Sequence, residues 1–155
     1  MSLLLALLAA ATPLADPTAD PTNVASAADI AAQVAAMTRE MKPDQHFAWK
    51  PLLRGGETVA ALEIWTAPGK PAVHPAEAEY TTVIAGAGTL VSGGRMADAA
   101  TTRPGLIEGS RIEGGTTRTL RPGDVILIPA GTPHWFGVTG GKLVLLGTKI
   151  AQAVK

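Results

Sequence analysis

The chain has 155 residues, enough for one domain with a single substantial core and too few for two comfortable ones. Its 13 basic and 13 acidic residues cancel, so nothing in the composition indicates a nucleic-acid binder or a membrane-surface helix. The absence of cysteine excludes disulfides, thiolate metal sites and cysteine nucleophiles. The 17 glycines and 12 prolines are typical of a turn-rich β domain.

The N-terminus opens with an unbroken apolar run at residues 3–11. Its length is about half of the roughly 20 residues that a bilayer span requires, so no membrane span is expected. The run resembles the core of a signal peptide, and the three alanines at 9–11 suit a cleavage site. No Lys or Arg precedes it, and an apolar tail is the alternative. Export to the periplasm or the medium is therefore predicted, with a cytoplasmic location as the alternative.

The next segments divide the rest of the chain into three parts. Prolines recur at residues 12–24, so residues 1–25 are assigned to a signal peptide and a Pro-rich linker. Residues 26–43 predict an amphipathic helix over 27–42, with Ser26 as its N-cap and Pro43 at its end. Its apolar residues recur at helical spacing, at Ile30, Val34, Met37 and Met41.

Residues 44–155 predict an all-β barrel or sandwich. Short β-branched or aliphatic segments bounded by Gly or Pro follow one another at regular spacing. The expected strands are 58–66, 80–85, 88–92, 106–113, 116–120, 124–128, 135–138 and 142–149. Pairs of glycines at 93–94, 114–115 and 140–141 predict hairpin turns, and residues 94–105 predict a loop.

The segment 123–134 is predicted to hold His134 in a defined position. Four branched apolar residues at 125–128 predict a short strand buried on both faces. Pro129 and Gly131 then predict a turn that delivers His134 at a fixed distance from the strand.

A second candidate site lies upstream at His74 and Glu79. A proline-initiated turn separates the two residues, so they can approach one point from adjoining strands. If His134 joins them, the set is two imidazoles and one carboxylate. That set suits a divalent first-row metal with open positions for other ligands.

These two stretches together resemble the cupin superfamily. The second cupin motif, G-x5-P-x-G-x2-H-x3-N, is met at Gly123, Pro129, Gly131 and His134, and Val138 replaces its asparagine. The first motif, G-x5-H-x-H-x3,4-E-x6-G, is met at His74, Glu79 and Gly86. Ala72 occupies the position of the motif's first histidine, and Thr66 occupies the position of its opening glycine.

The resemblance implies a cupin-type jelly-roll β-barrel, commonly a homodimer, preceded here by the one helix. It implies that His74, Glu79 and His134 bind one divalent metal (Fe, Mn, Ni or Zn) in the barrel mouth, with Ala72 as a vacated position. The alternative is a metal-free barrel in which the three side chains hydrogen-bond one another. Glu77 and His46 are considered as replacement ligands, although a surface role is expected for both.

Strand alternation predicts the surroundings of this site. Thr81 and Val83 should share the inward face of Glu79, and Phe136 and Val138 that of His134. With Ala72 they form a mostly apolar pocket, which suits a small organic ligand.

Glu63 is a lone charge among buried-looking residues of the strand 58–66. Burial would raise its pKa and make it a candidate catalytic acid or base. The alternative is an ion pair with Arg54 or Lys50.

The sequence thus predicts a small exported cupin that binds one metal and acts on a small organic molecule, first of all as an oxygenase. The alternatives are an isomerase or lyase that uses the metal as a Lewis acid, and a non-catalytic module that binds a small ligand.

Overall fold

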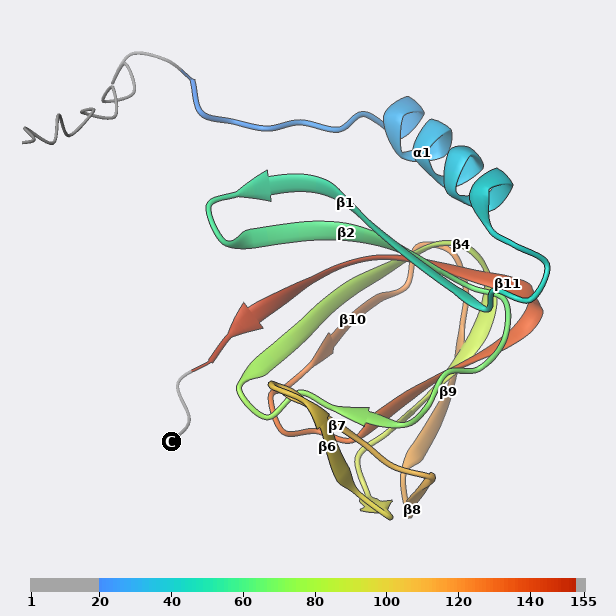
Figure 1. Cartoon of the computed structure of the whole chain (residues 1–155), viewed down its shortest axis with the longest axis vertical. Coiled ribbons are helices and arrows are strands. Elements are labelled where there is room, and N and C mark those ends of the chain that lie inside the picture. The colour runs from blue at the N-terminus through green and yellow to red at the C-terminus, as the bar shows by residue number, and fades with distance from the viewer. Residues whose placement is uncertain (1–19, 153–155) are drawn as a thin grey trace, which may run out of the picture.

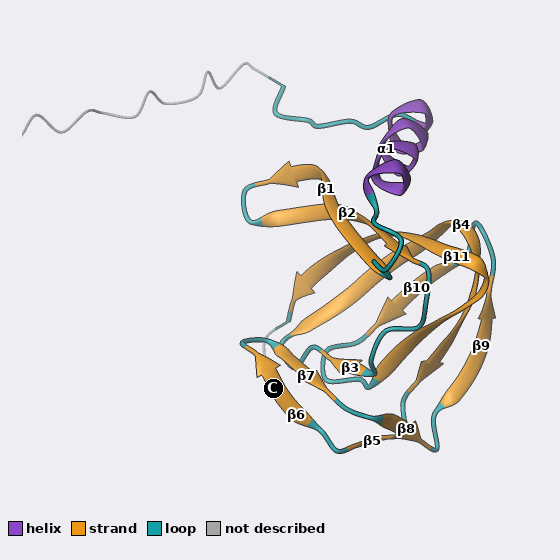
Figure 2. Cartoon of the chain, turned by 45° about the vertical axis from the view of Figure 1, so that its right-hand side comes forward, coloured by secondary structure: helices purple, strands orange, loops and turns teal. Residues whose placement is uncertain are grey.

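The computed structural model describes residues 20–152, which form one helix and a β-barrel (Figures 1 and 2). The proposed signal peptide and the first part of the linker lie outside the described residues. The elements are α1 (Ala27–Glu40), β1 (Phe47–Gly55), β2 (Thr58–Trp65), β3 (Ala72–Val73), β4 (Glu77–Ser92), β5 (Arg95–Ala97), β6 (Ala100–Arg103), β7 (Leu106–Glu108), β8 (Arg111–Glu113), β9 (Thr116–Leu120), β10 (Val125–Ile128) and β11 (His134–Ala151).

Helix α1 confirms the predicted amphipathic helix. Its N-terminus is a capping box: the Asp29 amide donates to the Ser26 hydroxyl at 3.2 Å, and the Ser26 amide donates to the Asp29 carboxylate at 2.8 Å. Its apolar face packs on the outside of the barrel, where Met37 is buried against Leu62 and Ile64 of β2. No helix in residues 20–152 is long and apolar enough to cross a membrane.

The long strands β4 and β11 form the spine of the barrel. They pair antiparallel along nearly their whole length, from His134 opposite Ser92 to Ala151 opposite Glu77. β11 also pairs with β2 and β3, and β4 pairs with β9 and β10. This arrangement confirms the expected jelly-roll barrel.

Side-chain alternation along these strands creates two apolar clusters. The inner cluster fills one part of the barrel and includes Leu90, Phe136 and Leu145. The outer cluster joins β2 and β11 to helix α1. The helix is therefore part of the domain, because it covers apolar residues on the outer face of the sheet.

The expectation that 125–128 is buried on both faces is wrong. Val125 and Leu127 are 60% and 61% exposed, whereas Ile128 is buried. β10 pairs only with β4, so it is an edge strand with one face on the core and the other on solvent. A run of branched apolar residues does not distinguish this case from a buried strand.

Other details of the strand prediction are also wrong. The segments 80–85 and 88–92 belong to one strand, β4, and 135–138 and 142–149 belong to another, β11. Residues 94–105 contain β5, which pairs with β8, and β6, which pairs with β7 although all four of its residues are exposed. The strand expected at 106–113 is divided into β7 and β8. None of the three glycine pairs forms a hairpin turn: 93–94 and 114–115 join strands that do not pair with each other. The glycines at 140–141 lie inside β11, where the register shifts between Val138 and Leu143, so they form a bulge.

Strand β1 was not among the predicted strands. It contains Pro51, which cannot donate to a ladder, and its register with β2 shifts between Pro51 and Leu53. β1 pairs only with β2, and an edge strand tolerates this proline.

Gly86 tests the importance of the β4–β11 contact. Its φ is +82°, and an added Cβ would lie 2.0 Å from the carbonyl oxygen of Lys142. Gly93 has a similar φ of +76° but open space around it. We expect Gly93→Ala to lower the free energy of unfolding by about 1 kcal/mol and Gly86→Ala by about 3 kcal/mol or more. Urea denaturation measures both, and equal losses would contradict the close approach.

Candidate metal site

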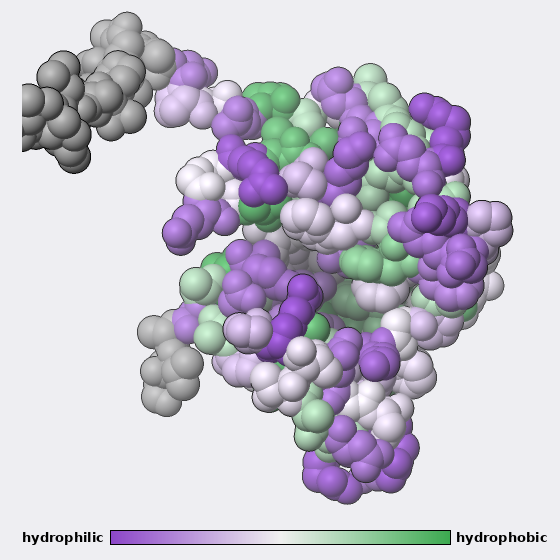
Figure 3. Space-filling model, viewed as in Figure 1, coloured by the Kyte–Doolittle hydropathy of each residue, from purple (hydrophilic) through white to green (hydrophobic). Residues whose placement is uncertain are grey.

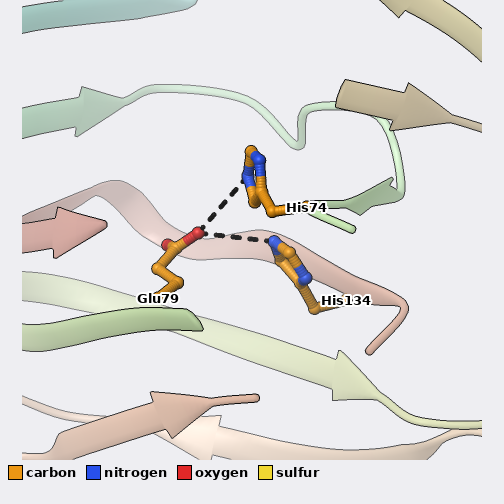
Figure 4. Close-up of side chains that lie close together, drawn as sticks. All are labelled: His74, Glu79 and His134. Atoms are coloured by element: carbon orange, nitrogen blue, oxygen red, sulfur yellow. Dashed lines mark ion pairs between the residues drawn. The ribbon is translucent and has the colours of Figure 1, made fainter. Parts of the chain in front are cut away.

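Three side chains that are distant in sequence converge in the barrel. Nε2 of His74 and Nε2 of His134 lie 3.6 Å and 3.5 Å from the same carboxylate oxygen, Oε2 of Glu79 (Figure 4). The imidazole centroids are 5.5 Å apart. Glu79 and His134 are buried, and the His74 side chain is 13% exposed. The structure thus brings together the three residues proposed from the sequence as ligands.

The turn before β11 fixes His134. The Thr132 amide donates to the Pro129 carbonyl at 3.2 Å, and Gly131 has a φ of +76°, which favours glycine. His134 then begins β11 between β3 and β4, opposite Ala72 and Ser92. The proline and glycine of the sequence motif therefore act by setting the point at which the chain enters the strand.

His74 is held by two separate segments. The Gly131 amide donates to its backbone carbonyl at 2.9 Å, which links it to the same turn that places His134. Its ring Nδ1 lies 3.3 Å from the carbonyl oxygen of Gly105, in the turn between β6 and β7. The strands around the cavity therefore determine the orientation of the ring.

Both imidazoles are oriented for metal binding through Nε2. Nδ1 of His134 lies 3.0 Å from the carbonyl oxygen of Thr132. Nδ1 of His74 likewise lies 3.3 Å from the carbonyl oxygen of Gly105. A carbonyl only accepts, so each Nδ1 carries the proton, and the neutral ring has its lone pair on Nε2. Burial, followed by the charge of Lys149, lowers the pKa of His74 and favours this neutral form.

Glu79 is the charged centre of the site. Burial alone would raise its pKa, but a hydrogen bond from Nε2 of His134, formed when that ring is protonated and no metal is bound, and the charge of Lys149 outweigh burial and lower the pKa to about 2. Nζ of Lys149 contacts Glu79 Oε2 directly, and the two residues are cross-strand partners on β11 and β4. Glu79 is therefore an anion at neutral pH.

The donor set fits a divalent transition metal. Nitrogen and oxygen ligands about 2.1 Å from a tetrahedral metal lie about 3.4 Å from one another. The two Nε2–Oε2 distances, 3.6 Å and 3.5 Å, are close to this spacing. The cluster is the one group of three potential ligands, all within 4.8 Å of one another, in the described part of the chain.

A cavity of about 800 Å³ opens beside the three residues. Figure 3 shows a hollow on this face with pale and apolar surface inside and hydrophilic residues around it. Aromatic side chains of β1, β2 and β11 and residues 103–106 form much of its wall. A smaller cavity of about 240 Å³ adjoins it, and Glu79 and Lys149 line both cavities.

The residues expected to form the pocket have different positions. Ala72 and Phe136 line the large cavity, and Thr81 lines the smaller one, where its hydroxyl donates to the Leu146 carbonyl at 3.2 Å. Val83 and Val138 belong instead to the inner apolar cluster. The mouth of the barrel is therefore more aromatic than the alternation pattern predicts.

Glu63 lies on the wall of both cavities. Its Oε2 accepts a hydrogen bond from Trp65 Nε1 at 3.0 Å. Burial and then the negative charge of Glu79 raise its pKa. Lys50, one of the alternative partners of Glu63, pairs with Glu40 at 3.5 Å.

The proposed replacement ligands do not join the cluster. Glu77 lines both cavities, and His46 is exposed with its Nδ1 3.4 Å from the Thr66 hydroxyl. Lys149 and Trp49 were not among the site residues predicted from the sequence. Alternation from Leu145 through residue 147 would have placed Lys149 on the inner face. Trp49 lies on β1, for which no strand was predicted.

The sequence also matches a family model described as Cupin over residues 51–148, more than half of the chain. The chain belongs to the cupin family. The match includes all three cluster residues and ends within β11, so it covers the barrel and not helix α1. A search of curated protein sequences found no significant match.

Solved structures share the cupin fold at low identity. They include a Schizosaccharomyces pombe Cnp3 cupin domain (13% identity, TM-score 0.51), a cupin-2 domain from Rhodospirillum rubrum (15%, 0.51) and the TT1209 protein from Thermus thermophilus (17%, 0.52). The matches cover 70%, 74% and 77% of this chain. They span less than two thirds of the first two chains, 63% and 66%, and 95% of the third. At these identities the likeness shows the fold alone.

The low pKa of Glu79 predicts a specific acid sensitivity. A carboxylate with a folded-state pKa of about 2 contributes stability above its unfolded value, near 4.5, and loses it as the pH falls from there toward 2. Between pH 5 and pH 3 we expect Glu79 to account for a loss of about 2 kcal/mol in the free energy of unfolding.

Urea denaturation of the wild type and of Glu79→Gln at both pH values measures this loss. The variant should be less sensitive to acid by that amount. Parallel pH dependences of the two proteins would show that Glu79 does not carry the effect.

Proposed function

We propose that this cupin binds one divalent metal through Nε2 of His74, Nε2 of His134 and the Glu79 carboxylate, and acts on a small organic molecule in the adjoining cavity. The observation that carries the proposal is the orientation of the two imidazoles. Each Nδ1 is bonded to a backbone carbonyl, so in the neutral rings both Nε2 lone pairs lie beside one buried carboxylate, where a metal would take them.

An oxidation that uses dioxygen is the first candidate reaction. A metal held by two histidines and one carboxylate keeps positions open for substrate and dioxygen, or acts as a Lewis acid in isomerase or lyase chemistry. The metal ion is Fe, Mn, Ni or Zn, because this ligand set accepts each of them. The cavity wall would orient the substrate and exclude water. Glu63, whose pKa is raised by burial, would hold or move a proton at its carboxyl group.

A second candidate is a metal-free cupin that only binds a small ligand. The observation in its favour is Lys149, whose ammonium group contacts Glu79 and already gives that carboxylate a cationic partner. In this case the histidines and Glu79 would form a polar network in the barrel.

Metal analysis with one matched pair of variants separates the two candidates. Purified protein is stripped with chelator and titrated with zinc, manganese, nickel or ferrous iron by calorimetry. The proposal predicts one equivalent of metal bound. His134→Ala should weaken binding roughly 100-fold or more, whereas His46→Ala, at an exposed site outside the cluster, should have no effect. Equal binding by the wild type and His134→Ala would refute the proposed site.

The substitution Ala72→His tests the same site by adding a potential metal ligand. Ala72 pairs directly with His134 on the neighbouring strand, so a side chain at this position should enter the same cavity. We expect the fourth ligand to tighten metal binding about tenfold. In a barrel without a metal site, the substitution should leave metal binding undetectable.

Oxygen consumption then distinguishes the reaction classes. Metal-loaded protein is tested with a panel of small organic acids and alcohols in an oxygen electrode. Uptake that depends on both substrate and metal supports an oxygenase, and turnover of a substrate without uptake supports Lewis-acid chemistry.

We also propose export and homodimerisation. Export rests on residues 3–11, and detection of the chain in the periplasm or medium of the source cells tests it.

Homodimerisation is motivated by apolar side chains exposed on β4, β10 and β11: Tyr80, Val125, Leu127 and Ile150. Light scattering of the full chain should give twice the monomer mass, and a monomer at micromolar concentration would contradict it.

A further inference from the structure

Four side chains on the β1–β2 hairpin form a continuous surface inside the large cavity. Phe47 pairs with Trp65, and Trp49 pairs with Glu63. All four line the cavity, and we name them the aromatic block. Since Glu63 is the only charged member, the block presents three aromatic rings on the wall of a cavity that also contains His74, Glu79 and His134.

The block is held in place without a ligand. The rings of Phe47 and Trp65 are 4.3 Å apart between centroids with an interplanar angle of 43°. The indole nitrogen of Trp65 donates to Glu63 at 3.0 Å. These contacts restrict Trp65, Phe47 and Glu63, so a ligand would meet a surface whose conformational entropy is already reduced.

Apolar surface of the block remains uncovered although it lines a cavity. Phe47 is 39% exposed and Trp49 is 48% exposed. An indole ring with an open face is suited to stacking on a flat ring, since aromatic pairs prefer offset-stacked arrangements and gain from them beyond the area they bury. The volume of about 800 Å³ is in the range of small-molecule sites.

Positive charge lies in the same cavity. The Lys149 side chain is 35% exposed, and its ammonium group contacts Glu79 through one of three available donors. Arg103 and Lys70 also line the cavity, and Lys70 lies 3.8 Å from Glu108. Lys149 can therefore donate to a second anionic group, such as the carboxylate of a ligand.

We propose that the cavity binds a small aromatic carboxylic acid, with its ring on Trp49 and its carboxylate at Lys149. The proposal names the class of the small organic molecule and in this respect rests on the proposed function. Recognition by Trp49 and Lys149 does not require the metal, so the two can fail separately.

A set of four probes tests the two halves of the proposal. Benzoate has the ring and the charge, cyclohexanecarboxylate has the charge without the flat ring, benzyl alcohol has the ring without the charge, and glucuronate replaces the apolar ring by a polyol. Binding is measured by calorimetry and tryptophan fluorescence on the full chain, with chelator and again with zinc. We expect benzoate to bind at least about fivefold more tightly than each of the other three in both conditions.

Single substitutions should remove one preference at a time. Trp49→Leu keeps apolar area but should reduce the preference for benzoate over cyclohexanecarboxylate to less than about twofold. Lys149→Met should remove the preference for benzoate over benzyl alcohol, and Lys149→Arg should restore it. Trp135→Phe is the matched control, because Trp135 lines neither of the two cavities, and it should change neither preference. Melting curves verify that each variant is folded.

Several results would overturn the proposal. Tighter binding of glucuronate than of benzoate would show that the cavity recognises a polyol ring. Equal binding of benzoate and cyclohexanecarboxylate, or an unchanged preference in Trp49→Leu, would remove the stacking role of Trp49. Binding of benzoate with chelator but no uptake of zinc would refute the metal centre and leave the ligand class intact. Uptake of zinc without binding of benzoate would refute the ligand class and leave the metal centre intact.

Discussion

The antiparallel pairing of β4 with β11 is the constraint on which the rest of the structure depends. It places Lys149 directly opposite Glu79 and starts β11 at His134, so the register of this one pair sets the relation between the carboxylate, the ammonium group and one imidazole. The bulge between Val138 and Leu143 adjusts the register along the way. Gly86 lets the two backbones approach closely at that point, where a side chain would collide with Lys142.

A buried carboxylate needs compensating charge, and this barrel contains two ways to supply it. The ammonium group of Lys149 contacts Glu79, and the two Nε2 atoms lie beside the same oxygen, where together with it they could hold a divalent cation. A divalent cation would satisfy the imidazoles as well as the carboxylate, whereas Lys149 satisfies only the carboxylate. The chemical character of the site therefore depends on how a metal and Lys149 share the single charge of Glu79.

The helix and the relation among the three cluster residues could be predicted because their signals are local. Ser26, the apolar spacing and Pro43 define the helix, and the intervals around His74, Glu79 and His134 match a known motif. The exposed face of β10 and the strands β1, β5 and β6 could not be predicted in this way. Val125 and Leu127 are exposed, but the same residue types would occur in a buried strand. β6 has no apolar pattern, since its pairing with β7 depends on the backbone.

The sequence by itself determined the cupin motifs, the loss of the first motif histidine at Ala72 and the residue types available as ligands. Only the tertiary structure decided that both Nδ1 atoms bond to backbone carbonyls, that Lys149 contacts Glu79, and that Trp49 and Glu63 line the same cavity. The physical reason is that these relations join segments up to 70 residues apart through strand register, which the bulges in β1 and β11 shift. The spacing of residues along the chain predicts the turns that position a side chain, but it does not predict which groups that side chain contacts across the barrel.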